Sequence, residues 1–238
     1  MHIWIGDLAP PTEWMDTWRR FHPDWKYDVI DNAFIASRRF QNQSLIDWYM
    51  RSMQFAGAAD LIRYELLFES GGFIAEADSV CMRNTDELWT RPCAYTVYEN
   101  EFLRGKLVSP ILASNPKNPF VGDLIDQLGN LQPDEIGSPW MTTGNLFVAQ
   151  MIETRNPDIE IFPSHFFIPV HYSGVKYEGK GPVYAHQLFG STRKAYGKPN
   201  MRGHIRRLWG KYRRLKAKKN TQSRIEKVIF EVRHGLLK

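Results

Sequence analysis

The stretch Tyr64–Val80, "YELLFESGGFIAEADSV", decides the expected fold. It starts as the end of an apolar helix and breaks at Gly71 and Gly72. Glycine just past the last periodic residue is typical of a helix C-terminus. A short apolar run follows and ends in two carboxylates, Glu76 and Asp78. We therefore predict a helix, a tight turn and a buried strand whose far end is negatively charged.

Strand and helix patterns alternate on both sides of this stretch. The apolar runs "HIWIG" (2–6) and "YDVID" (27–31) flank an amphipathic segment that begins at Thr12. A helical region is expected from Ser44 onward, interrupted at Gly57. A strand–helix–strand order favours an α/β fold.

Composition limits the class of protein. Of the 238 residues, 43% are hydrophobic and 13% aromatic, which is enough for a sizeable core. The two cysteines, Cys81 and Cys93, form no CxxC pair, which favours a reducing compartment. Neither a signal peptide nor a membrane-spanning run is recognisable, so we expect a cytoplasmic protein.

Charge is distributed unevenly along the chain. Residues 193–238 contain 16 Lys and Arg against two acidic residues, whereas residues 1–192 carry a net charge of −9. This predicts an acidic domain over 1–192 and a basic amphipathic helical extension over 193–238. The extension suits the inner face of the cytoplasmic membrane or packing on the acidic domain, and nucleic acid is the less favoured partner.

The two carboxylates have a chemical interpretation. In a strand, residues i and i+2 face the same side, so Glu76 and Asp78 should lie close together. Paired carboxylates repel each other unless a cation offsets their charge. Oxygen ligands suit Mg²⁺ or Mn²⁺, although a solvated strand end is the common alternative for an isolated E-x-D.

The wider block around these carboxylates matches a known pattern. Residues 58–78, "AADLIRYELLFESGGFIAEAD", resemble the signature of glycosyltransferases with a DxD sugar-binding motif. The resemblance is to the family 32-like group, which is related to fungal mannosyltransferases and to glucosylating bacterial toxins. Three shorter blocks follow the family order: "HIWIG" at 2–6, "TTGNLF" at 142–147 and "AHQLFGS" at 185–191.

The resemblance implies a fold and an activity. The fold would be of the GT-A type, with a mixed, mainly parallel central sheet flanked by helices. The activity would be metal-dependent transfer of a sugar from a UDP- or GDP-sugar to a glycan or lipid-linked glycan. Relatives mostly retain the anomeric configuration, so an α-linkage is expected, in surface polysaccharide or lipopolysaccharide synthesis.

It also implies roles for individual side chains. Asp78 and Glu76 would be the catalytic metal-binding pair for Mn²⁺ or Mg²⁺, with His186 as a further ligand. The donor would be held by residues from all four blocks: Trp4, Asp60, Arg63, Asn145, His186 and Ser191.

Two positions depart from the family pattern. Glu76 replaces the first Asp of DxD, and Thr192 replaces the expected Trp, so the donor remains open. The main alternative is a non-catalytic protein on the same fold that binds membrane or nucleic acid through its basic extension. A pyrophosphatase acting on nucleotide sugars is a third option.

Overall fold

The computed structural model describes residues 1–132, 135–190 and 196. The predicted basic extension, together with Ser191 and Thr192, therefore lies outside the described residues, apart from Tyr196. The division into a domain at 1–192 and an extension at 193–238 stays a prediction.

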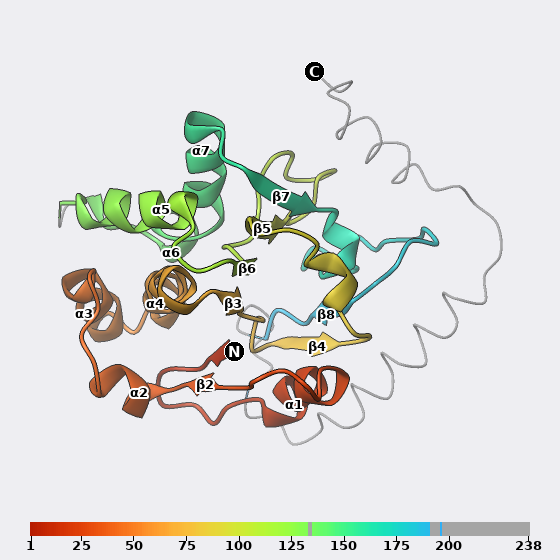
Figure 1. Cartoon of the computed structure of the whole chain (residues 1–238), viewed down its shortest axis with the longest axis horizontal. Helices are drawn as coiled ribbons and strands as arrows, with labels where there is room; N and C mark the ends of the chain where they lie inside the picture. Colours follow the sequence, from red (N-terminus) through yellow and green to blue (C-terminus); the bar gives the residue numbers. More distant parts are fainter. Residues whose placement is uncertain (133–134, 191–195, 197–238) are drawn as a thin grey trace.

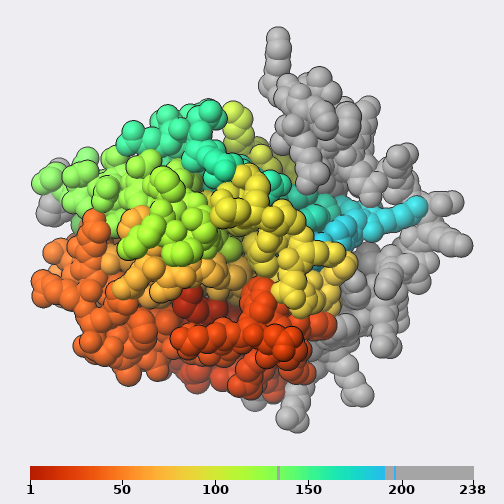
Figure 2. All heavy atoms as spheres, viewed as in Figure 1, coloured from red at the N-terminus to blue at the C-terminus, as the bar shows by residue number. Residues whose placement is uncertain are grey.

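Helices gather on one side of the molecule, where α3, α4 and α5 pack side by side (Figure 1). In Figure 2, the N-terminal residues follow the lower edge of this face and the α5–α7 region its upper edge. The helices of the described residues are α1 (Thr12–Phe21), α2 (Asn32–Ala36), α3 (Gln43–Arg51), α4 (Phe55–Ser70), α5 (Pro119–Gly129), α6 (Pro139–Thr142) and α7 (Asn145–Arg155), with the 3₁₀ turns η1 (Asp86–Leu88) and η3 (Ser164–Phe166).

The strands are short and form three small sheets, ordered β1-β2, β3-β6-β5-β7 and β4-β8. An isolated bridge between His2 and Ala75 joins the first of these to the chain just after β3. The strands are β1 (His2–Ile3), β2 (Val29–Ile30), β3 (Gly72–Phe73), β4 (Ser79–Cys81), β5 (Ala94–Val97), β6 (Ala113–Ser114), β7 (Ile159–Phe162) and β8 (Ala185–Gln187).

The strand directions confirm a mixed α/β fold but correct one detail. Among the described residues, β1/β2 and β5/β7 are parallel, whereas β3/β6, β5/β6 and β4/β8 are antiparallel. The prediction of a mainly parallel sheet is therefore wrong. The predicted strand–helix–strand order from β1 to β2 is confirmed, and its two strands are parallel, as a helical connection allows.

Helix α4 is the centre of the core. Its residues 60–67 are all buried, including Leu61, Ile62 and Leu67. A helix that is buried all round packs against neighbours on several sides, here α3 and α5. Charged groups on such a helix are consequently forced into the interior, and Asp60 and Arg63 are both buried there.

Two glycines allow α4 to pack closely against its neighbours. One of them, Gly57, does not interrupt the helix as expected. Gly57 lies within the helix, and a Cβ there would come 2.6 Å from the ring of Tyr49 on α3. The glycine therefore permits close helix approach, and the chain breaks between Arg51 and Phe55 instead. Gly71 ends the helix as predicted with φ +66°, where a Cβ would meet Pro116 at 2.7 Å.

No helix within the described ranges is both long enough and apolar enough to cross a lipid bilayer.

Candidate functional site

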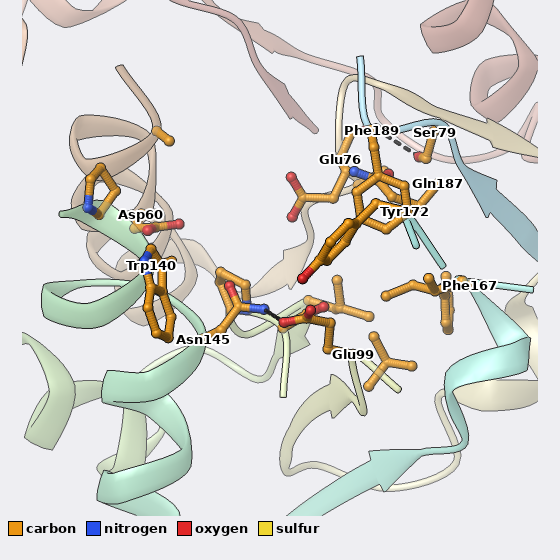
Figure 3. Close-up of a pocket in the computed structure, with 18 of the residues that line it drawn as sticks. Asp60, Glu76, Ser79, Glu99, Trp140, Asn145, Phe167, Tyr172, Gln187 and Phe189 are labelled. Carbon is orange, nitrogen blue, oxygen red and sulfur yellow. Dashed lines mark hydrogen bonds between the residues drawn. The ribbon is translucent and has the colours of Figure 1, made fainter. Parts of the chain in front are cut away.

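A cavity of about 600 Å³ opens between α4, the end of β5 and the segment before β8. Side chains from well-separated parts of the sequence line it. Figure 3 shows Glu76 and Glu99 on opposite sides of the open space, with Asp60 and Trp140 beside them. The volume lies within the range of roughly 300 to 1,000 Å³ that is usual for small-molecule sites.

One side is the helix wall, which we define as Asp60, Arg63 and Glu76. Arg63 is only 4% exposed, and its Nη2 lies 2.5 Å from Glu76 Oε1. Its Nη1 donates to the carbonyl oxygens of Ile111 at 3.2 Å and Ile74 at 3.5 Å. The Glu76 side chain remains 35% exposed and lines the cavity. A buried cation thus fixes a carboxylate that still faces open space.

Asp60 is the second acidic group of the helix wall. The hydroxyl of Thr143 donates to its Oδ2 at 2.9 Å. Burial raises the pKa of Asp60 to about 7, although Arg63 and the Thr143 hydrogen bond oppose the shift. A Cβ at Gly144 would lie 3.1 Å from the same oxygen, so this glycine lets the start of α7 approach the carboxyl group.

Asp78 does not lie where a strand would have placed it. Glu76 to Asp78 form a turn between β3 and β4, closed by a hydrogen bond from the Ser79 backbone nitrogen to the Glu76 oxygen at 3.0 Å. The two carboxylates therefore do not share one strand face, which corrects the prediction. The turn arises because the strand pairing of β3 stops at Phe73 and only Ala75 forms a further bridge.

The carboxylate of Asp78 accepts hydrogen bonds from the C-terminal part of the described chain. Its Oδ1 accepts from Gln187 at 2.6 Å, and its Oδ2 accepts from the Gly190 backbone at 2.7 Å and the Tyr196 hydroxyl at 3.1 Å. Burial is the main cause that raises the pKa of Asp78, and repulsion from Glu76 adds to it. Asp78 thus holds the segment around β8 in place behind the cavity.

The remaining predicted residues are spread around the cavity. Asn145 lines it, at the first turn of α7. Trp4 lies outside the described lining; its indole donates to the Leu8 oxygen at 2.7 Å and its ring meets Tyr196 edge-on. His186 pairs with Val80 in β4/β8 and faces away from its neighbour Gln187, which contacts Asp78.

The opposite side is the loop wall, which we define as Glu99, Arg104 and Tyr172. Glu99 is buried, and Asn145 Nδ2 donates to its Oε2 at 2.9 Å. The Nε2 atom of His171 lies 3.2 Å from Glu99 Oε1. Arg104 lies 3.9 Å from that oxygen and donates to the Tyr172 hydroxyl at 3.2 Å.

Sequence reasoning missed this second wall. One signal was available, because Glu99 follows the buried strand β5 just as Glu76 follows β3. His171 offered none, since nothing near it in sequence indicates its contact with Glu99, 72 positions away. Further lining residues that sequence reasoning missed include Trp18, Trp140, Gln187 and Phe189.

Metal binding is only partly compatible with this geometry. Within the described residues, no group of three or more His, Cys, Asp or Glu side chains could hold a metal ion. The predicted set of Asp78, Glu76 and His186 is therefore not assembled. Of these three residues, Glu76 is the one that lines the described cavity. One or two carboxylates plus substrate phosphates and water suffice for Mg²⁺, so Glu76 fits such an ion.

A family comparison identifies the region that forms the helix wall. Residues 12–94 match the model described as "Glycosyltransferase sugar-binding region containing DXD motif". This part of the chain is similar to a glycosyltransferase sugar-binding region. The predicted resemblance to DXD glycosyltransferases is thus confirmed, and so is the transferase class of enzyme. The match spans about a third of the chain and includes Asp60, Arg63, Glu76 and Asp78.

The chain was also compared with curated proteins and with solved structures. The search of curated proteins gave no match. Among solved structures, the chain is similar to one titled "PaToxG Glycosyltransferase", with a TM-score of 0.48 and 12% identity over 65% of this chain and 67% of that chain. DXD glycosyltransferases generally use a divalent metal, a nucleotide-sugar donor and an acceptor.

Proposed function

We propose that this protein moves a sugar from a UDP- or GDP-sugar to a glycan or lipid-linked glycan, with retention of configuration and with a divalent metal. The reaction would belong to the synthesis of surface polysaccharide or lipopolysaccharide. One observation carries the proposal: the Glu76 carboxylate faces the cavity, held by the buried Arg63, within the region that matches the DXD family model.

The helix wall suits the donor side of such a reaction. Arg63 fixes the orientation of Glu76, so the carboxylate needs no rearrangement before it binds a ligand. A pKa of about 7 leaves Asp60 populated in both protonation states near neutral pH. Asp60 can therefore either donate to or accept from a sugar hydroxyl at the cavity wall.

A metal ion would complete this side of the cavity. Mn²⁺ or Mg²⁺ supplies positive charge that neutralises a diphosphate leaving group. Glu76 is the residue that would hold it from the cavity wall, with Asp78 behind in the same turn. Trp4, Asn145, His186 and Ser191 stay as proposed donor contacts.

The proposed setting is the cytoplasm, on the inner face of the cytoplasmic membrane. The reason is the basic composition of residues 193–238, which attracts anionic lipid headgroups. Because that stretch lies outside the described residues, this part of the proposal depends on sequence alone.

Calorimetry tests the donor site directly. UDP and GDP are titrated, each with and without Mn²⁺, into the wild type, Glu76→Ala and the control Glu153→Ala. Glu153 is an exposed carboxylate on α7, outside the cavity lining. We expect metal-dependent binding of one nucleotide that weakens at least about tenfold in Glu76→Ala and persists in the control. Failure of both nucleotides to bind under every condition would refute the proposed function.

A further inference from the structure

The Glu99 carboxylate of the loop wall is held by two hydrogen bonds but can accept more. The backbone nitrogen of Ser173 donates to His171 Nδ1 at 3.3 Å, so Nδ1 is an acceptor and Nε2 carries the proton. Nε2 then donates to Glu99, whose other oxygen accepts from Asn145. Two donors thus orient the group, whereas a carboxylate has about four lone-pair positions. Glu99 can accept further hydrogen bonds from a ligand in the cavity.

Two aromatic rings line the same cavity as this carboxylate. Trp140 is 46% exposed and Tyr172 is 43% exposed, and both line the cavity. The Arg104 guanidinium lies 5.8 Å from the centre of the Trp140 ring and also donates to the Tyr172 hydroxyl. One cation therefore contacts both rings at the cavity edge. In Figure 3, the Tyr172 hydroxyl points toward Glu99, whereas Trp140 lies beside Asp60 on the other side of Asn145.

This pairing of groups matches one class of ligand. A sugar ring has a face of C–H groups and an edge of hydroxyls, so it needs an aromatic surface adjacent to hydrogen-bonding groups. Trp140 and Tyr172 offer the surface, and Glu99 accepts from hydroxyls.

Charge restricts the class further. Among the described lining residues, the carboxyl groups of Asp60, Glu76 and Glu99 outnumber the one guanidinium, that of Arg104. A donor diphosphate brings its own metal ion, whereas a negatively charged acceptor would be repelled by this excess of carboxylates, of which Glu76 is paired with Arg63. A neutral ligand avoids that cost.

We propose that the loop wall is the acceptor subsite, that its ligand is a neutral glycan, and that Glu99 binds an acceptor hydroxyl. The inference rests on the proposed function, because an acceptor implies a donor on the opposite wall. A further support is that the two walls of the cavity come from different parts of the sequence. The helix wall lies within the matched residues 12–94, whereas Glu99, Arg104, Trp140 and Tyr172 all lie beyond them.

A glycan array tests the ligand class without a donor. The full chain is applied to arrayed neutral glycans, anionic glycans, and peptides that contain Ser, Thr and Tyr. Affinity for the best retained probe is then measured by calorimetry for the wild type, Glu99→Gln and Trp140→Ala. The controls are Met141→Ala, which removes an exposed neighbour outside the described cavity lining, and Glu153→Gln.

We expect a neutral glycan to be retained and to bind about tenfold or more weakly in Glu99→Gln and Trp140→Ala, with both controls unchanged. Retention of no neutral glycan, or preference for an anionic glycan or a peptide, would overturn the inference. Binding that neither variant weakens would do so as well. Glu76→Ala separates the two proposals, since it should weaken nucleotide binding at least about tenfold and leave glycan binding intact.

Discussion

The helix wall and the loop wall each present a carboxylate to the same cavity, yet they are built in opposite ways. Glu76 is held by Arg63, which projects from the fully buried helix α4 and is 4% exposed. Glu99 is held by side chains from α7 and from segments outside helices and strands, and its neighbouring cation Arg104 is about a third exposed. The two walls therefore differ in their cations: Arg63 is part of the core, whereas Arg104 lies at the surface beside a buried carboxylate.

This difference predicts where mutations act. Groups of the helix wall contribute to folding as well as to the site, because water cannot replace the contacts they lose. The exposed groups of the loop wall, Arg104 and Tyr172, can be changed at little cost in stability, because water screens and solvates them.

The largest expected effect concerns Asp60. Its folded pKa of about 7 exceeds the unfolded value of 3.8, so between these values the folded state binds more protons. The free energy of unfolding should thus fall as the pH rises from about 4 to 7, by about 4 kcal/mol for this group. Asp60→Asn should remove that slope.

Urea unfolding of the wild type and Asp60→Asn between pH 4 and 8 measures the difference. Burial lowers the pKa of His2 to about 3, which gives an opposite slope, but both proteins share it and it cancels. Parallel pH profiles would show that the Asp60 carboxyl group is not in a water-excluded wall.

The arginines provide the next comparison. Arg63→Met removes the cation that pairs with Glu76 and leaves the Ile74 and Ile111 carbonyls without this donor. We expect a loss of about 3 kcal/mol in the free energy of unfolding, with part of the penalty relieved because Glu76 reaches water. Arg104→Met should lose less than about 1 kcal/mol. Equal losses in urea unfolding would contradict the distinction between the walls.

Two tyrosines give the smallest expected difference. Tyr64 on α4 is fully buried, and its hydroxyl donates to the Thr143 oxygen at 2.5 Å. Tyr64→Phe should therefore cost about 1.5 kcal/mol in the free energy of unfolding. The exposed Tyr172 should change by less than about 0.5 kcal/mol on substitution by Phe. Thermal unfolding of both variants ranks them, and the reverse order would count against the comparison.

The sequence allowed the helix wall to be predicted because its information is local. Asp60 and Arg63 lie on helix α4, glycine at 71 indicates where that helix ends, and Glu76 comes shortly after the next strand, β3. The relative positions of Asp60 and Arg63 follow from helix spacing. The position of Asp78 was harder to foresee, because β3 stops early and the partners of Asp78 lie more than 100 residues away.

The loop wall could not be predicted for the same physical reason. Glu99 meets Asn145 and His171 only after strands β5 and β7 have paired and α7 has packed. A single acidic residue after a strand has many possible environments, and only tertiary contacts select one. The two walls thus differ in how well the sequence predicts them, because the contacts within α4 are local and those of Glu99 are not.

The pairing of β8 with β4 has a consequence for how the chain is made. Asp78 and its partner Gly190 are 112 residues apart. A ribosome adds about 5 to 20 residues per second, so β4 exists for roughly 5 to 20 s before its partner strand has been synthesised. During that interval the carboxylate of Asp78 lacks the groups that finally surround it. In a newly made chain, this side of the cavity can therefore form only after β8 has been synthesised.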